Sequence, residues 1–282
     1  QGNIVFGAIL APSQRTSLWY QPVGGGAPVG GLVAGDLAPD SAGATTAGSA
    51  TFRAFDVPSM GAGRTFAFRG VLNADGDNTT NLKNDGIWRG SVAGGFVNIL
   101  RRGDSNASRA GLFSPGLTAL HPNVKAGNIY SGWITDGVGG RGAWLGWVVL
   151  DGDGINPFPI DTYGLFTDLA GSMNLLISTG DAAPDIAGST MAFIDHPVVG
   201  GADQLAFIGV VSGGSSNASN NKGIWRMDVN GGALQLVGLA YVQPDKILVA
   251  VQLALDVVDG QLGRTKRVRH GWARPSQVRV PG

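Results

Sequence analysis

The fold class of this chain can be argued from residues 66–101, which read FAFRGVLNADGDNTTNLKNDGIWRGSVAGGFVNILR. Short apolar runs alternate there with polar residues, and Gly, Asn and Asp stand between the runs. This alternation is typical of antiparallel strands with two unequal faces, joined by turns. Together with the run before them, these residues predict four strands: Thr51–Val57, Thr65–Leu72, Gly86–Ser91 and Val97–Arg101.

The same pattern returns three more times. Its first apolar run recurs at residues 4–6, 129–130 and 205–207, so Phe6, Phe68, Tyr130 and Phe207 are separated by 62, 62 and 77 residues. Periods of this length are typical of arrays and propellers. We therefore predict one all-β domain over residues 1–282, a small β-propeller of four or five antiparallel blades. The predicted repeats cover about 1–49, 50–111, 112–188 and 189–240.

Large aromatic residues occupy the matched position of the second run in every copy: Trp19, Trp88, Phe166 and Trp225. Each such side chain buries about 150–250 Å² and can fill the wedge between neighbouring blades. The alternative is a platform for a sugar or a cofactor. Because the aromatic residue recurs at the same position of every copy, packing between blades is favoured over a ligand platform.

Composition agrees with short strands and many turns. The chain has 47 Gly and 14 Pro among 282 residues, and all 20 acidic residues are Asp. Asp and Gly favour turns, whereas Glu favours helices, and no stretch shows a sustained helical period with caps. The absence of Cys excludes disulfides and thiolate chemistry. The longest apolar run, 247–258, is too short to span a bilayer, so we expect no membrane span.

Near the start of copies two, three and four, a Pro stands three residues after an apolar residue. These pairs are Phe55 and Pro58, Ala119 and Pro122, and Ile194 and Pro197, and the spacing returns at Trp272 and Pro275. We therefore expect residues 270–282 to form the first strand of the first blade, either within the chain or in a neighbouring copy. Residues 241–269 interrupt the pattern and predict an inserted hairpin.

Charge is distributed unevenly, although the net charge is zero. Residues 264–282 carry six basic and no acidic side chains, and Arg264, Lys266, Arg267 and Arg269 are the predicted partner-binding residues. A basic segment on an acidic body suits contacts with copies of the same protein, or with an anionic glycan or cell-surface polymer. The alternative is a solvated outer strand, and nucleic acid is not an expected partner.

Two loops rich in Asp and Gly are candidate calcium sites. Asp75 and Asp77 lie in one loop, and Asp151 and Asp153 lie in the other. Alternating carboxylates can wrap Ca²⁺, which takes six to eight oxygen ligands. Neither loop supplies a bidentate Glu, and Asp and Gly are also ordinary turn residues, so both interpretations stay open. The three His residues suggest no catalytic set, and no catalytic residue is predicted.

Several recurring pieces match a known pattern. They are Ala67-Phe68 and Ala206-Phe207, Gly86-Ile87-Trp88 and Gly223-Ile224-Trp225, and the Gly-Asp-x-x-Pro segments Gly35–Pro39 and Gly180–Pro184. These pieces resemble the bacterial tandem-repeat family of surface or exported proteins named for an Asn-x-x-Gly-x-x-Ala-Phe motif. In copy two, Gly61 and Arg64 stand where that motif has Asn and Gly. The resemblance covers about residues 1–240.

The resemblance implies a secreted or cell-surface β-repeat protein without established catalytic residues, and we expect its leader to have been removed. Two functions follow as expectations. One is a non-enzymatic structural or binding protein that assembles with itself into a fibre or layer. The other is a monomeric propeller that binds a glycan or small ligand through one loop face. A third interpretation, an Asp-based enzyme assisted by Ca²⁺, is the least favoured.

Overall fold

The computed structural model describes residues 4–10, 13–22, 24–45, 50–56, 58–61, 65–73, 85–135, 142–149, 162–168, 171–199, 204–214, 216–217, 221–228 and 233–239. As predicted, this part of the chain is all-β, with strands β1–β16 and a single six-residue helix. The predicted insertion (241–269) and closing strand (270–282) lie outside the described residues. No helix in the described ranges is long and apolar enough to cross a membrane.

The strands form four antiparallel sheets, numbered here along the chain. Sheet 1 contains β1 (Ile4–Leu10), β2 (Arg15–Gln21) and β3 (Val29–Val33). Sheet 2 contains β4 (Phe52–Phe55), β5 (Ser59–Met60), β6 (Phe66–Leu72), β7 (Asp85–Ser91) and β8 (Gly95–Arg101). Sheet 3 contains β9 (Lys125–Thr135), β10 (Gly142–Val149), β11 (Thr162–Thr167) and β12 (Asn174–Ser178). Sheet 4 contains β13 (Ser189–Val199), β14 (Gln204–Gly213), β15 (Lys222–Asp228) and β16 (Gln235–Leu239).

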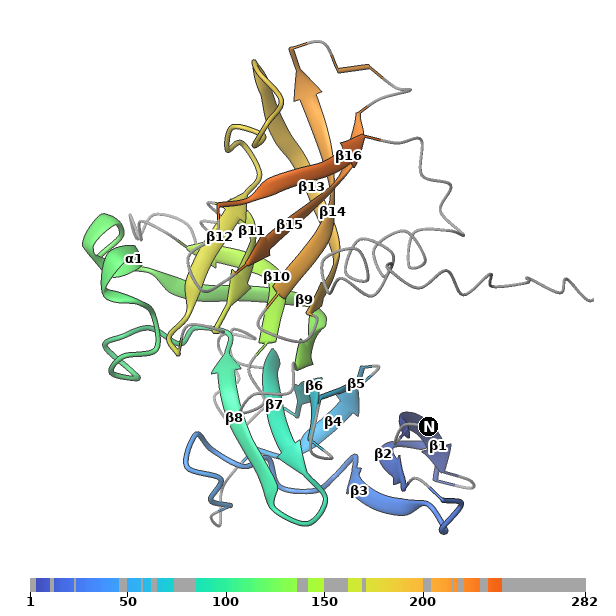
Figure 1. Ribbon diagram of the computed structural model, residues 1–282. Coiled ribbons are helices and arrows are strands. Elements are labelled where there is room, and N and C mark those ends of the chain that lie inside the picture. Colours follow the sequence, from blue (N-terminus) through green and yellow to red (C-terminus); the bar gives the residue numbers. More distant parts are fainter. Residues whose placement is uncertain are drawn as a thin grey trace, which may run out of the picture.

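Consecutive sheets pack against each other and bury three apolar cores. Leu18 of sheet 1 packs with Phe68 and Trp88 of sheet 2. Leu100 of sheet 2 shares a core with Phe166 of sheet 3, and Leu165 of sheet 3 shares one with Trp225 of sheet 4. Sheets 1 and 4 lie at opposite ends of the molecule (Figure 1). The described residues therefore form an open stack of sheets and do not show a closed propeller.

The strand registers correct one part of the sequence alignment. Phe6, Phe68 and Phe207 lie opposite Trp19, Trp88 and Trp225 in their sheets. In sheet 3 the residue opposite Phe166 is Trp144 of β10. Tyr130 belongs to β9, which is the first strand of sheet 3, so the prediction that Tyr130 matches Phe68 is wrong.

The only helix in the described residues, α1 (Pro115–Leu120), was not predicted from the sequence. Ser114 caps it, because the Ser114 hydroxyl accepts a hydrogen bond from the Leu117 N–H at 3.3 Å, and Pro115 occupies the first turn. Ala119 lies in this helix and not at the start of a strand. The apolar residues of the matched pairs in sheets 2 and 4 do fall on first strands, since Phe55 ends β4 and Ile194 lies in β13. Pro197 also lies in β13, whereas Pro58 follows the end of β4.

Three Gly-Asp turns join each sheet to the next. The carboxylates of Asp36, Asp104 and Asp181 each accept a hydrogen bond from the backbone N–H three residues earlier, at 2.7–2.8 Å. The preceding glycines have φ of 105°, 85° and 93°, a region that favours Gly. Their N–H groups donate to the first strand of the next sheet, at the carbonyls of Phe52, Ala126 and Met191. The same three residues donate back to the Asp carbonyls.

The matched tryptophans are held by these turns. Trp88 Nε1 donates to the Pro39 carbonyl at 2.9 Å, and Trp225 Nε1 donates to the Pro184 carbonyl at 3.2 Å. Both prolines end a Gly-Asp-x-x-Pro segment of the preceding sheet. Sheet 3 has Phe166 at the matched position and no such Pro before it, so no indole there needs an acceptor. Trp88, Phe166 and Trp225 are fully buried in the cores between sheets, which confirms the predicted packing for these three. Trp19 is only partly buried.

Candidate functional site

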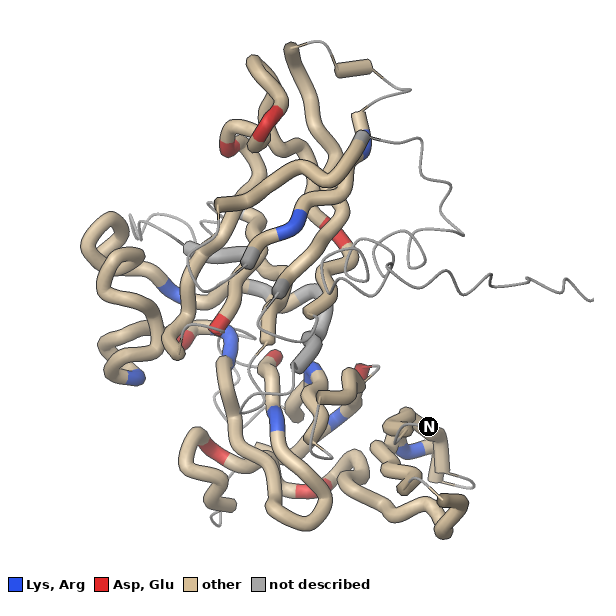
Figure 2. The backbone as a smooth tube through the Cα atoms, in the orientation of Figure 1, with Lys and Arg blue, Asp and Glu red and all other residues tan. Residues whose placement is uncertain are grey.

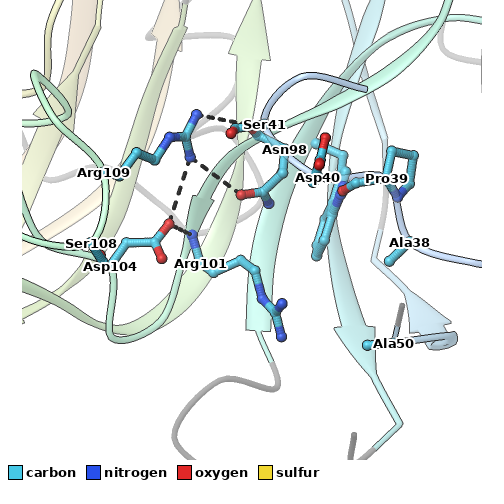
Figure 3. Close-up of a pocket in the computed structure, with 11 residues that line it drawn as sticks. Ala38, Pro39, Asp40, Ser41, Ala50, Asn98, Arg101, Asp104, Ser108 and Arg109 are labelled. Carbon is cyan, nitrogen blue, oxygen red and sulfur yellow. Dashed lines mark hydrogen bonds and ion pairs between the residues drawn. The ribbon is translucent and has the colours of Figure 1, made fainter. Parts of the chain in front are cut away.

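A polar pocket lies where the turn after sheet 1 meets β8 and the segment that follows β8 (Figure 3). Its volume is about 240 Å³. Pockets for drug-sized ligands usually measure about 300–1,000 Å³, so this one suits a single sugar ring or another small polar molecule. The residues that line it are Ala38, Pro39, Asp40, Ser41, Ala50, Trp88, Asn98, Arg101, Asp104, Ser108 and Arg109.

One wall is the loop that follows the first Gly-Asp turn. Asp40 Oδ1 accepts hydrogen bonds from the backbone N–H groups of Ala42 and Ala44, at 2.8 and 2.9 Å. The Asp40 carbonyl accepts a further hydrogen bond from the Asn98 N–H of β8 at 2.9 Å. These bonds fix both the loop and the orientation of the Asp40 carboxylate.

Asn98 is the polar floor of the pocket and is only 3% exposed. Its Nδ2 donates to the carbonyls of Ile87 and Leu100. Asn98 lies opposite Trp88, whereas the residue opposite Phe166 is Leu175 and the residue opposite Trp225 is Leu236. Sheet 2 thus has a buried amide where sheets 3 and 4 have leucine.

Arg109 comes from the segment between β8 and β9 and closes the pocket over the edge of β8. Its guanidinium donates to the carbonyls of Ile99 (2.7 Å) and Asn98 (2.8 Å), and to Asn98 Oδ1 (3.3 Å). It also lies 3.6 Å from Asp104 Oδ2 (Figure 3). Arg109 therefore ties the segment after β8 to that strand, and we call this set of hydrogen bonds the Arg109 clamp.

The remaining wall is the second Gly-Asp turn. Asp104 Oδ2 accepts the Arg101 N–H at 2.8 Å and faces Arg109. Asp104 Oδ1 accepts no hydrogen bond from the described residues, and the same holds for Asp40 Oδ2. With Arg101 and Arg109, the lining has equal numbers of basic and acidic side chains. Figure 3 labels these four residues around the pocket, and Figure 2 shows the basic and acidic residues of the described chain along the backbone.

The structure does not test the site residues predicted from the sequence. Asp75, Asp77, Asp151 and Asp153 lie outside the described residues, as do Arg264, Lys266, Arg267 and Arg269. The strands that flank the two loops in the sequence are described: β6 pairs with β7, and β10 pairs with β11. Among the described residues, no group of three or more His, Asp or Glu side chains is arranged to hold a metal ion.

Sequence reasoning missed the pocket. The available signal was Asn98, because an amide interrupts an apolar strand at the position opposite a matched tryptophan. Arg109 gave no such signal, because its contacts with β8 depend on how residues 102–124 fold back over the sheet edge.

The fold and the pocket define a class: an all-β protein of stacked antiparallel sheets with a small polar pocket between the first two sheets. Within this class, the chain belongs to a family of unknown function, DUF7453, whose model matches residues 1–239. No curated protein matches the chain. Among solved structures, the chain is similar to TolB from Acinetobacter baumannii, with 10% identity and a TM-score of 0.41. This match covers 85% of the chain, which spans 41% of the TolB chain.

Proposed function

We propose that the protein is a non-enzymatic binding module of an exported or cell-surface β-repeat protein, and that the pocket around Asn98 is its binding site. The observation that carries the proposal is the interruption of the apolar pattern at Asn98. The Asn98 amide is hydrogen-bonded within the chain through both Nδ2 and Oδ1, so its burial leaves no unpaired group. What sets sheet 2 apart is a polar residue at a position that is apolar in sheets 3 and 4. Here the amide and the Arg109 clamp support an open polar pocket where the corresponding positions of sheets 3 and 4 carry leucine.

A thermal-shift screen with small polar molecules tests this proposal. The screen should include monosaccharides, amino acids, carboxylates and inorganic phosphate, since a ligand that binds only the folded state raises the melting temperature. The substitution Ser41→Trp places an indole at the exposed rim of the pocket and should abolish the shift. Ser13→Trp, at an exposed turn of sheet 1, is the matched control and should keep it. If no class of compound stabilises the wild type, or if Ser41→Trp responds equally, the pocket is not a binding site.

Self-association is a second candidate function, and the surface of sheet 1 favours it. Ile4, Ile9 and Val29 are 57%, 72% and 45% exposed on this sheet. Exposed apolar residues mark contacts with other proteins where they form a continuous patch, and these three residues supply apolar surface for such a contact. The basic residues predicted to bind partners would add attraction to the acidic remainder of another copy. Sedimentation at low and high ionic strength tests this: an unchanged particle size rules out the electrostatic part, and a monomer under all conditions rules out self-association.

The propeller of four or five blades, closed by residues 270–282, belongs to this proposal as its expected complete architecture. Three of the four sheets have first strands joined to the preceding turn, and in sheet 1 the described residues begin with β1. Export or surface location is proposed on the resemblance of the recurring motifs. Fractionation of the native cells, with the protein detected by antibody, would separate an external from an internal location.

A further inference from the structure

We infer that the pocket takes a neutral, polyhydroxylated ligand about the size of one pyranose ring. This inference rests on the proposed binding function and adds the chemical class of the ligand. It follows from the hydrogen-bonding capacity that the folded chain leaves open in the pocket.

Two acceptors in the pocket are held in fixed positions. Asp40 and Asp104 each use one carboxylate oxygen for backbone N–H groups, which orients the side chain. The other oxygen, Oδ2 of Asp40 and Oδ1 of Asp104, accepts nothing from the described residues. A hydroxyl group can donate to such an oxygen, and hydrogen bonds to an ionised carboxylate are stronger than neutral ones. Two oriented carboxylates on opposite walls therefore suit a ligand with several hydroxyl groups.

Anionic ligands fit less well beside Arg109, although Arg101 also lines the pocket. Arg109 already donates to two backbone carbonyls and to Asn98 Oδ1, and it faces Asp104. An anion would meet the open oxygens of Asp40 and Asp104, and like charges at short range repel. Divalent cations fit poorly too, because the Arg109 guanidinium lies 3.6 Å from Asp104 Oδ2 and would oppose a second positive charge there.

Size limits the ligand to one ring within the pocket. The volume of about 240 Å³ lies below the usual range for drug-sized ligands and suits one sugar ring better than a nucleotide. Trp88 borders the pocket but is fully buried, so it offers no exposed face on which a sugar could stack. Recognition would depend on hydrogen bonds, and we expect affinities weaker than those of stacking sites.

Isothermal titration of the full chain with methyl pyranosides of glucose, galactose and mannose tests the inference, with glucuronate and CaCl₂ as the charged comparisons. At least one neutral pyranoside should bind, and glucuronate should bind at least about tenfold more weakly. Asp104→Asn and Asp40→Asn should each weaken pyranoside binding by about tenfold or more, because an amide NH₂ replaces the open acceptor. Asp181→Asn is the matched control, since Asp181 holds a corresponding Gly-Asp turn away from the pocket and its substitution should leave binding unchanged.

Each other outcome overturns the inference in a distinguishable way. If glucuronate or another anion binds while neutral pyranosides do not, the ligand class is wrong but the binding function stands. If Asp181→Asn weakens binding as much as Asp104→Asn, the effect is structural and the two carboxylates do not contact the ligand. If none of the titrated compounds binds the wild type, the inference fails, and the proposed function fails as well if the wider thermal-shift screen also finds no ligand. Melting temperatures measured without ligand show whether each variant is folded.

Discussion

The indole nitrogen of Trp88 links sheet 2 to the turn before it. Its N–H is removed from water by complete burial, and the Pro39 carbonyl is the acceptor that compensates. The same arrangement recurs with Trp225 and Pro184. Where the chain has Phe166, the acceptor proline is missing as well. The acceptor is a backbone carbonyl in both sheets, so the turn satisfies the one buried donor of each indole.

Replacing Trp88 with Phe should lower the free energy of unfolding by about 2 kcal/mol, because the Pro39 carbonyl loses its buried donor and the smaller ring leaves a void. Trp19→Phe is the matched control. Trp19 is only partly buried and donates to Ser17 Oγ within its own sheet, so its replacement should cost less than about 1 kcal/mol. Urea denaturation followed by circular dichroism measures both. Equal losses would contradict a role for the contact with Pro39.

Gly70 lets the ring of Trp88 lie flat against β6. A methyl group added at Gly70 would lie 2.7 Å from the ring of Phe52 and 2.9 Å from that of Trp88. Gly70→Ala should therefore destabilise the fold by about 1–3 kcal/mol through overpacking. Gly238→Ala in β16 is the control, since nothing lies within 4 Å of the added group. A melting temperature of Gly70→Ala equal to that of Gly238→Ala would show that the core between sheets 1 and 2 is looser than described.

At the level of turns and strands, the Gly-Asp turn performs the same task three times. It ends one sheet, reverses the chain through a glycine with positive φ, and pairs with the first strand of the next sheet. The Asp carboxylate closes the turn by accepting the N–H three residues earlier. The turn is therefore both a strand terminator and the connection between two sheets.

Gly180→Ala isolates the contribution of backbone conformation. An added methyl group at Gly180 meets nothing within 4 Å, but φ is 93°, so the substitution should cost about 1–2 kcal/mol. Gly116→Ala is equally free of contacts, but Gly116 lies in α1, where Ala is the better helix former by about 0.5–1 kcal/mol. Thermal denaturation should shift in opposite directions for the two variants. A shift in the same direction would contradict the left-handed turn.

The sequence predicted some of these elements well and others poorly, for physical reasons. The four strands expected between Thr51 and Arg101 are confirmed as β4, β6, β7 and β8. The third copy was misaligned because an alternating strand looks the same whether it is the first or the second in its sheet. Helix α1 is too short to show a hydrophobic period, although Ser114-Pro115 is a capping signal that could have been used.

Calcium binding at the Asp loops remains a prediction at this level. If the loops containing Asp75 and Asp151 bind Ca²⁺ only when folded, each bound ion should raise the free energy of unfolding by about 2.7 kcal/mol at a concentration 100 times the dissociation constant. The melting temperature in Ca²⁺, compared with the melting temperatures in a chelator and in Mg²⁺, measures this stabilisation. Asp75→Asn with Asp77→Asn should remove the response of that loop. A melting temperature that is identical in Ca²⁺ and chelator identifies the loops as ordinary turns.

Across the molecule, the first strands of sheets 2, 3 and 4 each hydrogen-bond to the Gly-Asp turn that ends the preceding sheet. Whether the propeller closes therefore depends on which segment pairs with the first strand of sheet 1. Phe55 pairs with Gly70 in sheet 2, and Ile194 pairs with Gly209 in sheet 4. The position in β1 that corresponds to these glycines is Ala8, two residues after Phe6. If Trp272 takes the place of Phe55 and Ile194, as the shared spacing to Pro predicts, it should pair with Ala8.

A double substitution, Ala8→Cys with Trp272→Cys, tests this register directly. The chain has no other Cys, and residues paired across antiparallel strands lie about 4.5–5.5 Å apart at Cα, within the range that a disulfide spans. Mild oxidation should therefore form one disulfide. A monomer with altered mobility on a non-reducing gel indicates closure within the chain, whereas a ladder of oligomers indicates strand exchange between copies. Trp272→Cys paired with Gly7→Cys, one residue out of register, is the control, and comparable oxidation of both pairs would show that residues 270–282 do not form the first strand of sheet 1.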